Sequence, residues 1–164
     1  MSRRILGPLL VVLAPLLVAC GGDPEPEGPA TPANGTVALR FSATNGVRGS
    51  MNLVDPLKGA VYGGLYLAED VSAGGPRPDA VQVADVEILG VDLEAGDPSE
   101  ATWKSGPLAP NRYTFLGFFD VDGNGTPSYE PDPGDPVTLP FINQFDITSN
   151  EETPMTAVFE LVYN

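Results

Sequence analysis

The chain has 164 residues, of which 22 are acidic, eight are basic and none is histidine, so its formal charge is −14 at pH 7. A surface of that charge repels phosphate backbones, which excludes nucleic acid as a partner. The absence of histidine excludes a Ser-His-Asp triad and removes the commonest zinc ligand. The single cysteine, Cys20, excludes disulfides within the chain.

Residues 1–19 are typical of a signal peptide. Arg3 and Arg4 form a short basic region, and the uncharged run 5–17 is shorter than the roughly 20 residues that span a bilayer. The run ends in Leu-Val-Ala-Cys-Gly, residues 17–21, which resembles the lipobox of bacterial lipoproteins. In that family the cysteine carries acyl chains such as palmitate and becomes the mature N-terminus, so the resemblance implies lipidation of Cys20. The alternative is an ordinary signal peptide, in which Cys20 is a small apolar residue.

Two acyl chains anchor a protein stably, so we expect the membrane to be a partner through the lipid on Cys20. No Asp follows the cysteine directly, and by resemblance to lipoprotein sorting rules this favours the outer membrane of the cell envelope over the inner membrane. Removal of Arg3 and Arg4 with the signal peptide leaves six basic and 22 acidic side chains, a formal charge of −16.

Residues 20–35 are predicted to be a tether. After Cys20 the sequence alternates Pro, Gly and acidic residues and offers nothing apolar to bury. The remainder, 36–164, is about 130 residues long, which suits one domain with its own core.

Seven segments of this domain are predicted to be strands: 36–43, 60–68, 81–91, 102–104, 112–119, 145–148 and 155–163. Apolar side chains alternate in most of them, as in 155–163, where every second residue from Met155 to Tyr163 is apolar. Segment 112–119 is apolar on both faces and is predicted to be central. A phase shift at Ala84 and Asp85 indicates a β-bulge. The fold class is therefore all-β: a single antiparallel β-sandwich of about seven strands, Ig-like or transthyretin-like.

Residues 105–125, SGPLAPNRYTFLGFFDVDGNG, carry a second resemblance. The stretch resembles one found in transthyretin-like and carboxypeptidase-regulatory-like sandwiches, in which a strand crosses the core and ends in a polar loop. The resemblance implies an accessory or scaffold domain without catalytic activity.

The loop that follows resembles an EF-hand calcium loop. Asp120, Asp122 and Asn124 occupy alternate positions, a glycine permits the sharp turn, and Thr126 offers its backbone carbonyl. Alternate residues of a tight loop aim their oxygens at one point, and calcium prefers oxygen ligands.

The second half of this loop departs from the motif, because Pro131 stands where the bidentate glutamate belongs. The candidates to complete the site are Glu130, Asp132 and Asp135. We expect a weak, structural calcium site with a Kd on the order of 10⁻⁴–10⁻³ M. The alternative is a solvated acidic turn, since Asp-Gly and Asn-Gly form turns without a metal.

The leading functional prediction is an envelope lipoprotein whose sandwich is a non-catalytic scaffold or binding domain with calcium in loop 120–135. The second is a carbohydrate-binding module or an envelope glycan-active enzyme that uses the acidic loop and nearby aromatic residues. Trp103, Tyr62, Tyr66 and Tyr129 are the candidates for an aromatic platform, with packing in the core as their alternative role. An envelope protein or a glycan is the expected partner.

Overall fold

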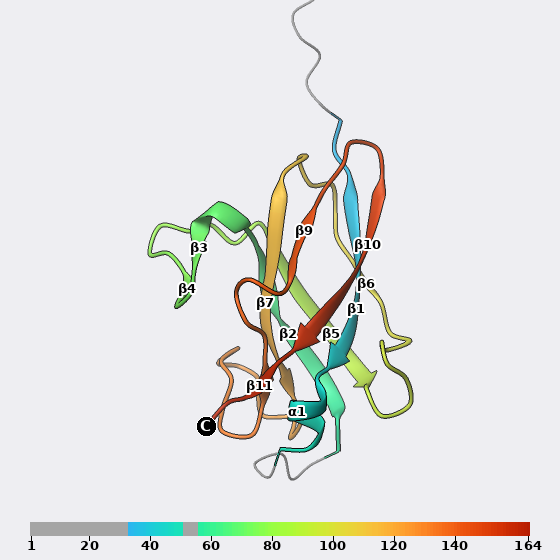
Figure 1. Ribbon diagram of the computed structural model, residues 1–164, viewed down its shortest axis with the longest axis vertical. Coiled ribbons are helices and arrows are strands. Elements are labelled where there is room, and N and C mark those ends of the chain that lie inside the picture. The colour runs from blue at the N-terminus through green and yellow to red at the C-terminus, as the bar shows by residue number, and fades with distance from the viewer. Residues whose placement is uncertain (1–32, 51–55) are drawn as a thin grey trace, which may run out of the picture. The chain divides into compact units, whose positions relative to one another are not determined.

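The computed structural model describes residues 33–50 and 56–164 (Figure 1). The predicted signal peptide, the lipidation site Cys20 and most of the predicted tether lie outside the described residues. Gly35, at the end of the predicted tether, already forms a β-bridge with Leu108 of the domain.

The described part folds as an all-β sandwich, which confirms the predicted fold class. The smaller sheet has the order β10-β1-β6 and consists of β10 (Glu152–Phe159), β1 (Thr36–Ala43) and β6 (Trp103–Lys104). Here β1 and β10 are parallel, whereas β1 and β6 are antiparallel. Figure 1 shows β1 beside β10 and, in the other layer, β2 beside β5 and β7.

The larger sheet is antiparallel and has the order β11-β8-β7-β2-β5, with β9 paired to β7. Its strands are β11 (Leu161–Val162), β8 (Pro136–Val137), β7 (Arg112–Asp120), β2 (Lys58–Leu67), β5 (Ala84–Asp92) and β9 (Gln144–Asp146). Strand β7 lies between β2 and the pair β8 and β9, so the prediction of a central strand at 112–119 is confirmed.

Three short elements complete the described chain. Helix α1 (Asn45–Arg48) follows β1 and is capped by Thr44, whose side chain accepts a hydrogen bond from the Val47 amide. The 3-10 helix η1 (Ala68–Asp70) leads into a small hairpin of β3 (Val71–Ser72) and β4 (Gly75–Pro76). No helix in the described residues is long and apolar enough to cross a membrane.

The core lies between the two sheets and is built from the alternating apolar side chains of their inner faces. Phe41 and Phe159 from the smaller sheet are fully buried, as are Phe115 and Phe119 from β7. The Phe41 ring lies 6.0 Å from that of Phe115, and the Phe119 ring lies 5.7 Å from that of Phe159. These aromatic pairs join the layers and add to the stabilisation from apolar burial.

The single strand predicted at 155–163 is wrong in its second half. The chain pairs with β1 up to Phe159 and then with β8 from Leu161, so it passes from one sheet to the other at Glu160. The change of sheet reverses the side-chain phase: Leu161 and Tyr163 are 52% and 45% exposed, and Val162 packs against the core instead.

The bulge predicted at Ala84 and Asp85 is also misplaced. These residues pair regularly with Leu65 and Gly64, and the register shift lies further along, opposite the interval from Gly59 to Val61. Gly90, on β5 near the shift, has a φ of 70°, a conformation that favours glycine.

Candidate functional site

The acidic loop begins with a buried carboxylate. Asp120, at the end of β7, is 2% exposed and accepts backbone hydrogen bonds from three loop amides. Its Oδ1 lies 2.8 Å from the Gly123 nitrogen and 3.2 Å from that of Asn124, and its Oδ2 lies 3.1 Å from that of Gly125. Asp120 therefore holds the predicted turn in shape with both of its oxygens, much as a carboxylate caps a helix.

A second group of loop side chains meets at Asn124. The amide nitrogen Nδ2 of Asn124 donates to Asp122 Oδ2 at 2.8 Å and to Asp132 Oδ2 at 2.6 Å. An amide donor thus stands between two carboxylates that would otherwise repel each other. Among the described residues, no three Asp, Glu, His or Cys side chains gather in a group that could hold a metal ion.

Asp135 closes the loop from beneath. It is fully buried, and its oxygens accept hydrogen bonds from the Val121 amide at 3.3 Å and the Asp132 amide at 3.2 Å. Burial raises the pKa of Asp135 to about 6, and the negative charges of Asp132 and Asp120 act in the same direction. The remaining predicted ligands, Thr126 and Glu130, are exposed on the loop.

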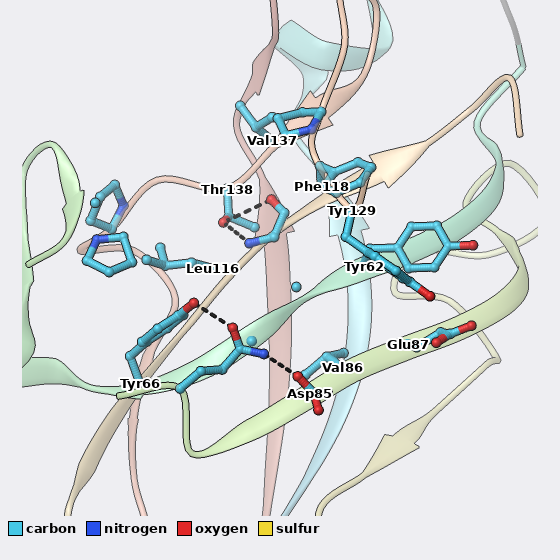
Figure 2. A pocket seen from close by; sticks show the side chains of 18 of the residues that line it. Tyr62, Tyr66, Asp85, Val86, Glu87, Leu116, Phe118, Tyr129, Val137 and Thr138 are labelled. Carbon is cyan, nitrogen blue, oxygen red and sulfur yellow. Dashed lines mark hydrogen bonds between the residues drawn. The ribbon is translucent and has the colours of Figure 1, made fainter. Parts of the chain in front are cut away.

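A pocket lies elsewhere, on the outer face of the larger sheet (Figure 2). A pocket of about 790 Å³ opens over β5, β2, β7 and β8, away from the core. This volume is within the range of about 300–1,000 Å³ that is usual for small-molecule sites.

The strand register explains the floor of this pocket. Glu87, Tyr62, Phe118 and Val137 are direct cross-strand neighbours on β5, β2, β7 and β8, and they form one row across the sheet. The row carries a carboxylate at its β5 end and aromatic rings in its middle.

The next row of the outer face is hollow at its centre. It consists of Asp85, Gly64 and Leu116, two residues further along each strand. Because Gly64 has no side chain, no side chain of β2 covers the sheet at that point. Only the side chain of Gln82 lies over it. A Cβ on Gly64 would lie 2.4 Å from Gln82 Cδ. Glycine at this position therefore leaves a depression at the centre of the second row, over which only the Gln82 side chain lies.

Loops form the walls. Tyr129 and Pro131 of the acidic loop stand on one side, and the turn of the β3-β4 hairpin, 73–76, lines the pocket as well. The Tyr129 ring is 55% exposed and lies 5.5 Å from the Tyr62 ring at 80°, so the two rings form a corner. Tyr129 has a φ of 54°, and its backbone amide donates to the Gly125 carbonyl at 2.8 Å. The ordered acidic loop thus positions the one well-exposed aromatic side chain of the wall.

Polar groups in the pocket are connected to one another. The Tyr66 hydroxyl donates to Gln82 Oε1 at 2.6 Å, and the Gln82 amide donates to Asp85 (Figure 2). Burial raises the pKa of Tyr66, and the negative charge of Asp85 adds a smaller effect. Burial also raises the pKa of Tyr62, and the negative charge of Glu87 adds to it. Both phenols are therefore neutral hydrogen-bonding groups at physiological pH.

Three of the four predicted platform residues, Tyr62, Tyr66 and Tyr129, do line this pocket. Trp103 does not, because it lies on β6 of the smaller sheet and packs against the core. Asp85 and Glu87 were not among the candidates predicted from the sequence. Their only signal was their position at alternate residues of a strand, which placed both on one face.

Comparisons with known proteins add no relatives. No protein-family model matches the chain, and the searches of curated proteins and of solved structures found no match either.

Proposed function

We propose that the protein is a non-catalytic binding domain that holds a ligand in the pocket on the outer face of its larger sheet. The observation that carries the proposal is the pocket itself. The outer face of a sandwich sheet is ordinarily a solvated surface of polar side chains. Here it carries buried Tyr62 and Phe118 together with a glycine-floored depression, under two loops that rise above it.

The chemistry of the lining supports binding rather than catalysis. Its one aliphatic hydroxyl, that of Thr138, donates to the Gly117 carbonyl at 3.2 Å and accepts from the Gly117 amide at 2.9 Å. A nucleophile needs a base within hydrogen-bonding reach, and this hydroxyl is occupied by the backbone instead.

We place this domain on the cell envelope through the lipid expected on Cys20, with the outer membrane favoured. The support is the lipobox-like sequence and the acidic, proline-rich segment that follows it. A tether of that composition separates a domain from the membrane surface, so the pocket would remain accessible to envelope partners.

We also propose that calcium stabilises loop 120–135. Asn124 already lies within hydrogen-bonding distance of both Asp122 and Asp132, and all three side chains carry oxygens that can bind a metal. Calcium would require the Asn124 amide to present its oxygen in place of the donor Nδ2. The oxygens of Asp120 and Asp135 already accept backbone amides and support the loop from beneath.

A carbohydrate-binding module or glycan-active enzyme is the second candidate. It is favoured by the three tyrosines of the pocket and by the carboxylates Asp85 and Glu87, which share one face of β5. A glycosidase needs two carboxylates at a defined separation across the scissile bond. Turnover of a glycan that is lost in both Asp85→Asn and Glu87→Gln would establish the enzyme and refute the non-catalytic proposal.

The proposal is tested by saturation-transfer NMR with a panel of small cations, neutral sugars and aromatic compounds. The mature chain is used in a polyoxyethylene detergent, whose headgroup carries neither sugar nor charge. We expect at least one class to bind the wild type and to lose binding in Gly64→Val, which fills the depression. Binding that persists unchanged in Gly64→Val, or no binding by any class, contradicts a ligand pocket at this face.

A further inference from the structure

The pocket has an unusual balance of charge. Its lining contains two carboxylates, Asp85 and Glu87, and no Lys or Arg. Four of the basic side chains in the described residues pair with acids that do not line the pocket: Arg48 with Asp97, Lys58 with Asp92, Lys104 with Glu152, and Arg112 with Asp146. Within the described part of the chain, neither pocket carboxylate has an ion-pair partner.

The nearest basic residue in the sequence does not change this balance. Arg77 directly follows Pro76 of the wall but is not part of the lining. The loop on the opposite side adds further negative charge, since it contains Asp122, Glu130 and Asp132. A charged group that enters the pocket is therefore attracted if it is a cation and repelled if it is an anion.

The aromatic rings of the pocket also favour a cation. Glu87 lies directly across from Tyr62 on the neighbouring strand, and the Tyr129 ring stands at 80° to the Tyr62 ring. Two rings at a corner with a carboxylate beside them can surround a compact cation, which is attracted to aromatic faces and to the carboxylate together. Figure 2 shows Tyr62, Tyr129 and Glu87 on the same side of the pocket.

The same geometry argues against stacking of a neutral sugar. A pyranose ring lies flat against an exposed aromatic face. The Phe118 ring is tilted by 37° from the Tyr62 ring, and Tyr129 meets Tyr62 nearly at a right angle. No flat platform is formed by these three residues.

We propose that the ligand of this pocket is an organic cation, with its ammonium group between Glu87, Asp85 and the rings of Tyr62 and Tyr129. The inference rests on the proposed binding function and names the class of its ligand. A volume of about 790 Å³ exceeds what an ammonium group needs, so the cation is carried by a larger molecule. The same ammonium chemistry is found in lysine side chains and in quaternary amines.

The test compares charged probes with neutral probes of the same shape. Choline is paired with 3,3-dimethylbutan-1-ol, in which carbon replaces the ammonium nitrogen, and butylammonium is paired with butan-1-ol, in which a hydroxyl replaces the ammonium group. The first pair probes a quaternary amine and the second the group of a lysine side chain. Dissociation constants are measured by NMR titration of the mature chain at low and high salt.

We expect the preferred cation to bind at least about tenfold more tightly than its neutral partner, which corresponds to about 1.4 kcal/mol. High salt should weaken the binding of the cation and leave the binding of the neutral probe unchanged. Glu87→Gln should remove most of this preference. Glu100→Gln, an exposed acid outside the pocket, removes the same charge and should retain the preference.

Two further variants test the aromatic contribution. Tyr129→Phe keeps the ring and should bind the cation as tightly as the wild type does. Tyr129→Leu removes the ring and should weaken cation binding several-fold. Charged and neutral probes that bind the pocket equally, or a neutral sugar that binds in place of both, would overturn the cation assignment and leave the binding function standing. Failure of every probe and every sugar to bind would remove the binding function as well.

Discussion

Gly63 and Gly64 are neighbours on β2, yet the structure predicts opposite outcomes when each is replaced by alanine. A Cβ on Gly63 would lie 2.3 Å from the Leu116 carbonyl oxygen and 2.9 Å from Phe115 Cε2, both in the adjacent central strand. Backbone of a paired strand cannot move without loss of ladder hydrogen bonds, so Gly63→Ala should destabilise the domain by about 1–3 kcal/mol. Gly117 pairs with Gly63, and a Cβ on Gly117 would lie 2.3 Å from the Tyr62 carbonyl oxygen. Gly117→Ala should therefore destabilise the domain to a similar extent.

At Gly64 the new Cβ meets only the side chain of Gln82, which is exposed and can turn away. The lost Gln82 hydrogen bonds are offset by the gain of about 0.5–1 kcal/mol from replacing glycine in a strand. Gly64→Ala should therefore leave the stability within about 0.5 kcal/mol of the wild type.

The assay is urea unfolding followed by far-ultraviolet circular dichroism, with the wild type and all three variants at one pH and salt concentration. Equal destabilisation by Gly63→Ala and Gly64→Ala would refute the assignment of one glycine to the inner face and the other to the pocket floor. Destabilisation by Gly64→Ala alone would show that the two glycines are assigned to the wrong faces of the sheet.

Four other predictions follow from the anchor and the acidic loop. Cys20→Ser should move the protein from the membrane fraction to the soluble fraction, measured by fractionation and immunoblotting; retention in the membrane would contradict the lipid anchor. In excess chelator, Asp135 should stabilise the fold fully below its ordinary pKa of 3.8 and lose that stabilisation, up to about 3 kcal/mol, as the pH rises through about 6. Asp135→Asn should reduce this dependence of the unfolding free energy on pH, measured in unfolding titrations. Calcium at millimolar concentration should raise the melting temperature of the wild type and not of Asp122→Asn, and identical melts with calcium and with chelator would leave the loop without a metal. Asp120→Ala should destabilise the fold by about 1–3 kcal/mol even in chelator, because three loop amides lose their acceptor.

Much of the fold could be predicted from side-chain alternation. The inner faces of β1 and β7 follow directly from it. Val37, Leu39 and Phe41 alternate along β1 and are buried, and the buried Tyr113, Phe115 and Phe119 lie at even spacings along β7. Alternation fails at Glu160, where the chain changes sheets. Such a change depends on which strand the segment pairs with, and that pairing is set by distant residues.

The acidic loop and the pocket differ in how far they could be predicted. The turn around Asp120 is local, so its spacing was visible in the sequence. The contacts of its side chains were not: Asp120 accepts backbone amides, and Asn124 donates its nitrogen to Asp122 and Asp132. The pocket depends on cross-strand register, which places Glu87 beside Tyr62, and Tyr62 beside Phe118. No local pattern contains that information.

The central claim is that the outer face of the larger sheet binds a ligand. Its most direct test is an amide NMR titration of the mature chain with choline and butylammonium, mapped residue by residue. We expect saturable shifts that concentrate at Gly63, Gly64, Glu87 and Tyr129 and that require a several-fold higher cation concentration in Glu87→Gln. Shifts scattered over the surface, or confined to the smaller sheet, would contradict it.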